Sequence, residues 1–278
     1  MKRRYLVVPV LALVVFAALA AVSPARAAVY PSTPLEKRIK ALAETLAPEL
    51  IDLRRDIHAN PELGLRETRT SALVADHFRK LGLEVRTGYA TTGVIGILKG
   101  GKPGPVVAMR GDMDALPIAE ETGLPFASKV TAVVDGRETG LMHACGHDIH
   151  TTLLIGVASV LAAVRADLPG TVVFIAQPAE ECCGGAGRMI ADGAFRDPVP
   201  EAFFAYHVDD TLKAGRVGYA SGFMSANVDG FDLEIRSDGC HGASPWSCVD
   251  PIVVGAEIVT ALQVLVGREL SVHDNTVI

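Results

Sequence analysis

Apolar residues recur every three or four positions in two segments near the start of the chain. From residue 35 to residue 57 this spacing predicts an amphipathic helix, with a break or second start at Pro48. Asn60-Pro61 should end the helix, because proline disfavours helical geometry in the residue before it. Residues 68–81 repeat the helical spacing, and Gly82 has the position of a C-cap.

Short apolar runs of the length expected for buried strands follow these helices. They occupy residues 93–98, 106–110, 171–176 and 202–206, after an alternating run at 83–86. Two further helices are expected at about residues 149–164 and 186–192, whereas residues 118–141 look irregular. Strands that alternate with helices predict an α/β domain.

The pattern changes after about Gly222. Residues 228–236 alternate between apolar and polar, which predicts a half-exposed strand. A Gly-rich turn at 237–243 precedes an amphipathic helix over 251–266, whose first turn begins with Pro251. We therefore expect a larger domain at residues 28–222 and the beginning of a small α+β domain at residues 223–278.

Residues 1–27 have the form of a secretory signal peptide. A basic start precedes an apolar stretch over residues 6–22, and Ala25-Arg26-Ala27 resembles a signal-peptidase site. We expect cleavage after Ala27 and an exported protein, periplasmic or secreted. The alternative is a membrane anchor that is not cleaved. The apolar stretch is, however, barely long enough to span a bilayer, which takes about 20 residues. No other stretch is expected to span a membrane.

Composition narrows the class of protein. The chain has 278 residues, of which 49% are apolar and 21% charged, so it can bury a sizeable core. The net charge is −6, and basic residues form no block outside the first four positions. A surface that binds nucleic acid needs clustered positive charge, so we expect no nucleic-acid partner.

The densest candidate chemistry lies in residues 142–150, which contain His143, Cys145, His147, Asp148 and His150. A thiolate and an imidazole two positions apart, beside a carboxylate, suit Zn²⁺, Mn²⁺ or Co²⁺. The alternative is a polar turn before a helix, with a buried and inert cysteine.

Carboxylates and a further imidazole follow the predicted strands. In chain order these groups are Asp112 and Asp114, then Glu180 and Glu181, then His207. Ligands of open α/β sheets bind beyond the carboxyl ends of the strands. We therefore expect these side chains to collect with Cys145 and His147 at one edge of the sheet.

Together these segments resemble the M20 family of metallopeptidases, and most closely its amidohydrolase branch, subfamily D. The matching motifs run in family order over about residues 38–278, at 55–64, 109–117, 142–151, 177–187, 206–208 and 239–251. The resemblance implies a catalytic domain with a mixed, mostly parallel sheet flanked by helices, and a small α+β lid or dimerisation domain. It also implies hydrolysis of the amide bond of N-acyl amino acids or small peptide-like amides.

The resemblance further implies two divalent metal ions, zinc or manganese, with cobalt or nickel as further candidates. Cys145 would bridge both ions, His147 and His207 would complete one side, and Glu181 the other.

Glu180 would be the general base, and Asp114 matches the position that orients a histidine ligand in wider relatives. Asp112 stands where those relatives carry that histidine, so it is not expected to bind metal. Asp148 and His150 are expected to cap and start the helix behind the cluster.

His241 matches a lid-domain histidine that, in dimeric relatives, reaches the partner's active site and holds the substrate carbonyl or carboxylate. The resemblance thus implies a homodimer formed through the lid domain. It implies a small N-acyl amino acid or dipeptide-like substrate. Separately, the absence of another long apolar stretch predicts no membrane contact after signal cleavage.

The chain departs from the family in length. Relatives return to the catalytic domain after the small domain and supply a last histidine ligand, which no motif here supplies. The chain therefore resembles an N-terminal fragment or a truncated product. Two alternatives stay open: a catalytically incomplete metal-binding fragment, and a cysteine hydrolase with Cys145 as nucleophile.

Four other cysteines accompany Cys145. Cys240 and Cys248 are spaced to close a short loop. A bridge between adjacent Cys182 and Cys183 would be strained, so two free thiols are expected there.

Overall fold

A computed structural model describes residues 32–222, 224, 229–271 and 276–278. The predicted signal peptide lies outside these residues. The chain divides into two compact units, of which the first ends at Val208 and the second begins at Asp209. The domain boundary expected at residue 222 stays a prediction.

Helix α2 (Pro34–Ala59) opens the first unit. Thr33 caps its N-terminus: its hydroxyl accepts the N–H of Glu36, and the Glu36 carboxylate accepts the N–H of Thr33. The helix continues through Pro48, so the predicted break is wrong. Pro48 is exposed, and the packing of α2 along α4 (His147–Ala163) supports the helix on both sides of the proline.

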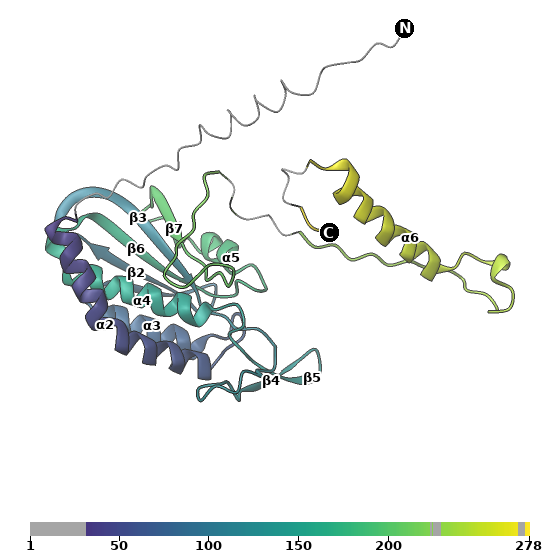
Figure 1. The fold of residues 1–278 in the computed structure, drawn as a ribbon, viewed down its shortest axis with the longest axis horizontal. Coiled ribbons are helices and arrows are strands. Elements are labelled where there is room, and N and C mark those ends of the chain that lie inside the picture. The colour runs from purple at the N-terminus through teal and green to yellow at the C-terminus, as the bar shows by residue number, and fades with distance from the viewer. Residues whose placement is uncertain (1–31, 223, 225–228, 272–275) are drawn as a thin grey trace, which may run out of the picture. The chain divides into compact units, whose positions relative to one another are not determined.

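Five strands form the main sheet, in the spatial order β1-β2-β6-β3-β7. They are β1 (Glu84–Tyr89), β2 (Gly93–Lys99), β6 (Pro169–Gln177), β3 (Lys102–Asp112) and β7 (Ala202–Ala205). Strand β2 is antiparallel to both of its neighbours, whereas β3 is parallel to β6 and to β7. Within this sheet only β2 therefore runs against the others, which confirms the mixed, mostly parallel sheet (Figure 1).

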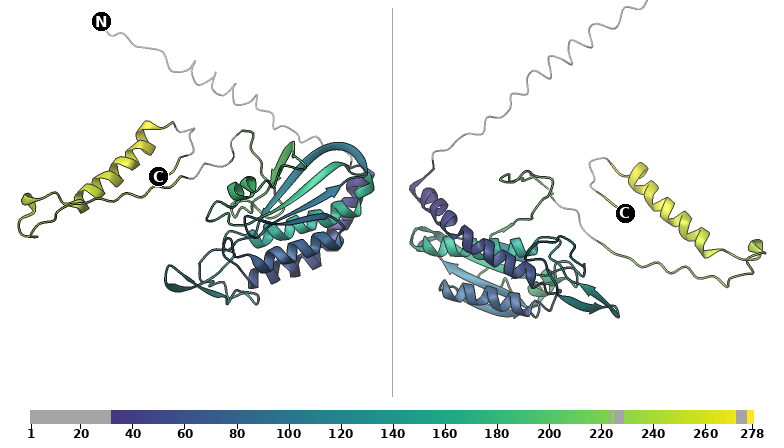
Figure 2. Two further views of the ribbon diagram at one scale, coloured as in Figure 1. Left: turned by 180° about the vertical axis from the view of Figure 1, so that it is seen from behind. Right: turned by 60° about the horizontal axis from the view of Figure 1, so that its bottom comes forward.

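Helices cover the sheet unequally. Helices α3 (Thr68–Lys80) and α4 pack on one face, with α2 outside α4, and α5 (Gly185–Ala191) lies on the other (Figure 2). The first face buries a core that includes Phe78, Leu154 and Phe174. The second buries a smaller core around Ile95, Ile175 and Met189. Gly82 follows α3 with φ +71°, as a C-cap glycine should.

Two parts of the first unit differ from the sequence-based expectation. Residues 118–141 include a hairpin of β4 (Thr131–Val134) and β5 (Arg137–Gly140), whose strands are too short for an apolar pattern to reveal. Strand β7 is exposed along its length rather than buried, because it lies at an edge of this sheet and no described helix packs along it. Short 3₁₀ turns occur at Arg165–Asp167 and, in the second unit, at Pro245–Ser247.

The second unit contains helix α6 (Pro251–Val264), which continues into a π-helical turn at Leu265–Glu269. The Asp250 carboxylate caps it by accepting the N–H of Ile252. The described part of residues 228–236 forms no strand, so that prediction is wrong for residues 229–236. A strand needs a partner for its backbone groups, and the described residues of this unit supply none.

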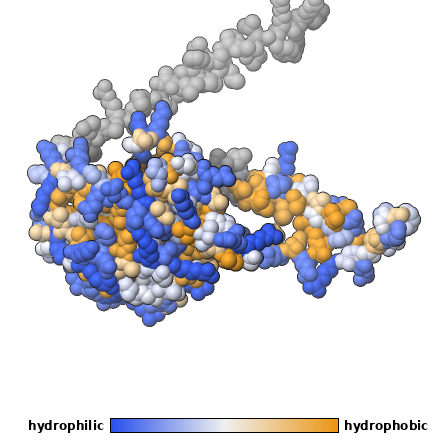
Figure 3. Space-filling view, turned by 90° about the horizontal axis from the view of Figure 1, so that it is seen from below, coloured by the Kyte–Doolittle hydropathy of each residue, from blue (hydrophilic) through white to orange (hydrophobic). Residues whose placement is uncertain are grey.

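Many apolar side chains of the second unit are exposed, as the space-filling view shows (Figure 3). Of the helices described, Pro251–Glu269 is long and apolar enough to cross a membrane. The expectation that no stretch beyond the N-terminus reaches that length is therefore wrong by length and composition.

Candidate metal centre

The carboxyl ends of three parallel strands bring the predicted residues together. Strand β3 ends at Asp112, directly beside Gln177 at the end of β6, and β7 ends just before His207. Helix α4 begins at His147, whose ring contacts Asp114 beyond the end of β3. The first unit thus collects the side chains expected at this edge: Asp114, Cys145, His147, Glu180, Glu181 and His207.

His147 is the centre of the cluster and is fully buried. Its Nδ1 lies 2.8 Å from the backbone oxygen of Asp114 and 3.3 Å from that residue's carboxylate. A carbonyl oxygen only accepts, so Nδ1 carries the proton and donates. In the neutral ring the lone pair of Nε2 then faces Glu180 at 3.9 Å and Glu181 at 3.7 Å.

Cys145 and His207 form a second group of donor atoms with His147. The Sγ atom of Cys145 is 3.4 Å from Nε2 of His207. The Nδ1 of His207 donates to the backbone oxygen of Val208 at 2.7 Å, so its Nε2 is also left free to accept. Both imidazoles therefore present Nε2 to the cluster, with the proton held on the opposite ring nitrogen.

Asp114 organises the turn that carries the two glutamates. Its two carboxylate oxygens accept the backbone N–H groups of Glu180 and Glu181, each at 3.0 Å. Consecutive side chains of an extended chain point apart, but in this turn both carboxylates come within 4 Å of His147. Pro178 before the turn and Gly184 after it, with φ +66°, match the bend expected from the sequence.

The donor atoms fall into three overlapping groups that share His147. Among the residues that the structure describes, these are Cys145/His147/His207, Asp112/His147/His150 and His147/Glu180/Glu181, each within 4.8 Å. Thiol, imidazole and carboxylate donors of this kind are the usual ligands of zinc and related divalent ions.

One buried atom indicates that a cation fits. Nε2 of His147 is buried and lacks a hydrogen-bond partner in the described structure. Buried polar atoms are nearly always satisfied, and a divalent ion at the Nε2 lone pair would satisfy His147. The residues present therefore fit a metal ion.

The electrostatics of the cluster also favour a bound cation. Burial raises the pKa of the Cys145 thiol to about 12, and the carboxylates of Glu181 and Glu180 reinforce the shift. Burial lowers the pKa of His147, but the neighbouring Asp114 and Asp112 outweigh it and raise that pKa above its usual value. The cluster is thus a strongly negative site, and a nearby cation is what would let Cys145 exist as a thiolate.

Both carboxylate oxygens of Asp112 have close partners, and the expectation that Asp112 does not bind metal stays a prediction. Burial raises its pKa, but the hydrogen bond from His150 and the charge of Arg110 outweigh burial and lower it. Its Oδ1 accepts from Nδ1 of His150 at 2.7 Å, and its Oδ2 lies 2.6 Å from Arg110.

The capping role expected for Asp148 and His150 is wrong, although Asp148 does lie in the first turn of α4. Helix α4 is capped by Gly146 in the left-handed conformation, with no side-chain cap. Asp148 is instead buried against Arg54 at 2.6 Å and His58 at 2.8 Å. His150 joins Asp112 to the backbone of Val208. A cap must precede a helix, whereas both residues lie inside it.

The cysteine pairing also differs from expectation. Cys182 and Cys183 form a disulfide directly after Glu181, so the expected free thiols are wrong. Cys240 and Cys248 form a second disulfide, which closes the loop considered from the sequence. Cys145 remains free.

Glu67 is a residue that the sequence did not single out. It is fully buried, and its carboxylate accepts the backbone N–H of Ala179 at 2.8 Å. An acidic residue just before a predicted helix looks like an N-terminal charge, so only the folded structure reveals its contact with the glutamate turn.

His241 lies in the second unit, where its Nδ1 accepts the N–H of Ala243 at 3.1 Å. Its expected role at a partner's site stays a prediction.

Comparison with known proteins places these observations in context. The sequence profile of peptidase family M20/M25/M40 matches residues 108–276. An N-acetylcysteine deacetylase of Bacillus subtilis is 41% identical over 230 residues, which cover 82% of this chain and 58% of the relative. The IAA-amino acid hydrolase ILR1-like 2 of Arabidopsis thaliana is 41% identical over 243 residues, which cover 86% of this chain and 53% of the relative.

A solved structure gives a further match. A Bacillus subtilis protein described as a dinuclear metal-binding peptidase is 42% identical, with a TM-score of 0.54. The match covers 62% of this chain and 45% of that one. The chain spans about half the length of the curated relatives it matches.

Proposed function

Because the chain belongs to peptidase family M20/M25/M40, we propose that it takes part in metal-dependent hydrolysis of an amide bond. The substrate would be an N-acyl amino acid or a small peptide-like amide. The observation that carries the proposal is the free, buried Nε2 of His147 among Cys145, Glu180 and Glu181.

Four side chains would hold the metal ions: Cys145, His147, Glu181 and His207. Their mixture of sulfur, nitrogen and oxygen donors suits Zn²⁺ or Mn²⁺, with Co²⁺ or Ni²⁺ as further candidates. The relative described as a dinuclear peptidase supports two ions. Bound divalent ions would polarise the substrate carbonyl and lower the pKa of water.

Glu180 would act as the general base. Its side chain is 39% exposed, against 23% for Glu181, so water and substrate can reach it more easily. The carboxylate would take the proton of the attacking water and then deliver it to the departing nitrogen. Such a base contributes about 10²–10⁴-fold to the rate.

Asp114 would act through its neighbours. It holds the proton of His147 on Nδ1, which leaves Nε2 free, and it fixes the backbone of both glutamates. Burial alone would raise its pKa, but the hydrogen bonds from His147, Glu180 and Glu181 outweigh burial and lower it. Asp114 thus stays ionised as an acceptor.

The substrate, the dimer and the location of the protein are also part of the proposed function. The similarity to a deacetylase of N-acetylcysteine and to a hydrolase of amino-acid conjugates supports a small N-acyl amino acid as substrate. His241 would bind its carbonyl or carboxylate in a homodimer formed through the small domain. The protein would be exported, periplasmic or secreted.

One observation favours a second candidate function. Cys145 and His207 lie 3.4 Å apart, which is the separation of a cysteine nucleophile and its base. The negative surroundings that raise the Cys145 pKa to about 12 argue against a reactive thiolate. A Cys145→Ser variant that keeps full metal binding but loses hydrolysis would support the cysteine hydrolase.

A chelation experiment tests the proposed function. The purified chain is assayed on N-acetyl and N-benzoyl amino acids before and after removal of metal, and again with Zn²⁺ or Mn²⁺ restored. Removal should abolish hydrolysis and restoration should recover it. Glu180→Gln should lower kcat about 10²–10⁴-fold at unchanged metal content, while Glu121→Gln, an exposed control, should not.

Hydrolysis that survives thorough chelation would refute metal dependence. Assay of the chain beside a version extended by a further histidine-bearing segment tests the incomplete-fragment alternative. Metal binding without hydrolysis in the short chain alone would favour that alternative.

A further inference from the structure

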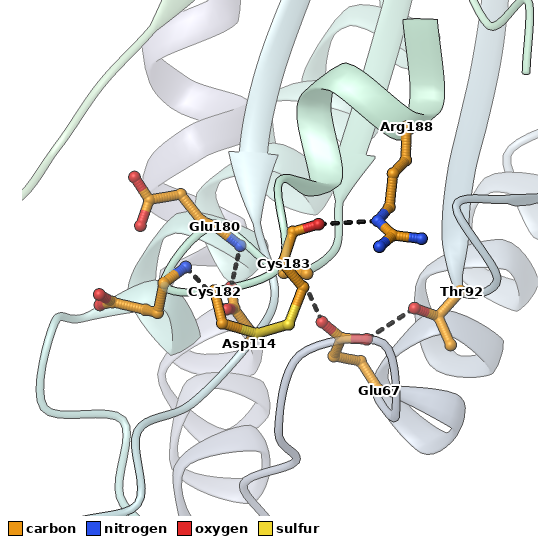
Figure 4. The surroundings of a disulfide bond; sticks show 9 residues. Glu67, Thr92, Asp114, Glu180, Cys182, Cys183 and Arg188 are labelled. Atoms are coloured by element: carbon orange, nitrogen blue, oxygen red, sulfur yellow. Dashed lines mark hydrogen bonds between the residues drawn. A yellow bond between two sulfur atoms is a disulfide. The ribbon is translucent and has the colours of Figure 1, made fainter. Parts of the chain in front are cut away.

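Two buried carboxylates hold the turn that carries the glutamates. Asp114 accepts the N–H groups of Glu180 and Glu181, and Glu67 accepts the N–H of Ala179, one residue earlier. Three successive backbone N–H groups therefore donate to carboxylate oxygens, which come from two distant parts of the chain. Figure 4 shows both carboxylates beneath the turn, with the Cys182–Cys183 disulfide between them.

Glu67 makes two hydrogen bonds. Its Oε1 accepts from Ala179 at 2.8 Å, and its Oε2 accepts from the hydroxyl of Thr92 at 2.6 Å. No Lys, Arg or His of the described residues forms an ion pair with it, although it is fully buried. Burial of a carboxyl group without a charged partner is unfavourable, so an acid at this position is not explained by packing alone.

The residue that Glu67 holds has an unusual backbone conformation. Ala179 has φ +51°, a region that residues with a Cβ seldom adopt. Its carbonyl accepts the N–H of Gly185 at 3.0 Å, so both of its backbone polar groups are fixed. A Cβ on Gly64 would lie 3.1 Å from the Cα of Ala179, so the loop before Glu67 packs directly against the turn.

We propose that Glu67 is a positioning residue that fixes the direction of the glutamate turn. It holds Ala179 in the left-handed conformation, and this sends the chain into the bend that brings Glu180 and Glu181 to His147. Thr92 fixes the carboxylate from its other side. Glu67 fixes the turn through the hydrogen bonds that its two oxygens accept, and its negative charge is not required. The inference rests on the proposed function for the roles of Glu180 and Glu181.

Two substitutions separate hydrogen bonding from charge. Glu67→Gln keeps an oxygen for the N–H of Ala179, and its amide can donate to the Thr92 oxygen. Glu67→Ala removes both acceptors. Thr92→Val keeps the side-chain size but removes the donor that orients Glu67, and serves if Glu67→Ala does not fold. Ile97→Ala, in the core of the sheet, controls for general loss of stability.

The first readout is hydrogen exchange of the amides of residues 179–181 in the metal-free chain. We expect Glu67→Ala to speed this exchange about tenfold, the size of one lost hydrogen bond. Thr92→Val should act in the same direction, and Glu67→Gln should match the unaltered chain. This readout needs no catalytic activity, so it decides on Glu67 even if the chain hydrolyses nothing.

The second readout is steady-state hydrolysis of an N-acetyl amino acid by the metal-loaded chain. Glu67→Ala should lower kcat about 10- to 100-fold with little change in KM, because a misdirected base costs rate more than binding. Glu67→Gln should recover kcat, and Ile97→Ala should keep it. Unchanged exchange and kcat in Glu67→Ala would overturn the inference. Equal losses in Glu67→Gln and Glu67→Ala would also overturn it, because the charge would then be required.

Discussion

The backbone N–H of Val208 donates a hydrogen bond of 3.0 Å to Nε2 of His150. The other ring nitrogen of His150 donates to Asp112 at 2.7 Å. His150 therefore connects the end of β3 to the residue that follows His207. The hydroxyl of Tyr206 donates to the backbone oxygen of His150 at 2.8 Å, so the segment is fixed on both sides of His207.

Loss of the His150 ring should therefore weaken metal binding at His207. We expect His150→Leu to lower the affinity for Zn²⁺ about 10- to 100-fold, the usual cost of losing a residue that supports a ligand. Competition with a chromogenic chelator measures this. His77→Leu, on α3 away from the cluster, is the control. Equal affinities of the two variants would show that His150 does not support the site.

Several features of this site were predictable from the sequence. The strand ends after β3, β6 and β7 placed Asp114, the glutamate pair and His207 at one edge, because parallel strands end together. What the sequence did not reveal is which buried residues support these groups. The contacts of His150 with Val208, and of Glu67 with Ala179, join residues 58 and 112 positions apart. No local pattern encodes such contacts.

The errors in the predicted elements have a similar origin. The local geometry of Pro48 predicts a break, but the tertiary contacts of α2 outweigh the one lost hydrogen bond. The apolar residues of β7 predict a buried strand, yet Phe203 and Phe204 are more than half exposed. An apolar run predicts a strand, but not whether a neighbouring element covers it.

A side chain at Gly146 should destabilise the fold. It has φ +86° between Cys145 and His147, and a Cβ there would lie 2.5 Å from a methyl group of Val208. Gly146→Ala should lower the free energy of unfolding by about 1–3 kcal/mol. Gly136→Ala, at φ +75° with open space, should cost less. Denaturant unfolding of the two variants makes the comparison, and equal losses would contradict the close contact with Val208.

The cysteine pairing predicts a thiol count. With the two disulfides formed, the denatured but unreduced chain should react with one equivalent of a thiol reagent, at Cys145. After reduction, all five cysteines should react. Mass spectrometry of the labelled chain identifies the sites. Labelling of Cys182 and Cys183 before reduction would contradict the disulfide beside Glu181.

Because of Glu67, the free energy of unfolding should depend on pH. Burial raises its pKa above the ordinary 4.5, and the charge of Asp114 adds to this, while hydrogen bonds from Thr92 and Ala179 act against it. A raised pKa in the folded state means that the protonated acid stabilises the fold. Its contribution is fully present below about pH 4.5 and is lost as the pH rises through the folded-state pKa.

Glu67→Gln cannot ionise, so it should lack this loss. The unfolding free energy of the unaltered chain should fall relative to that of Glu67→Gln as the pH rises above 4.5. Urea unfolding of both proteins from pH 4 to pH 8 measures the difference. A difference that does not change with pH would contradict the raised pKa.

The central claim is that His147 and its neighbours bind divalent metal. Calorimetric titration of the metal-free chain with Zn²⁺, beside His147→Ala, tests it most directly. We predict that the unaltered chain binds Zn²⁺ and that His147→Ala loses at least about 100-fold in affinity, since all three donor groups share this residue. An unaltered chain that fails to bind, or a His147→Ala variant that binds equally well, would contradict the account.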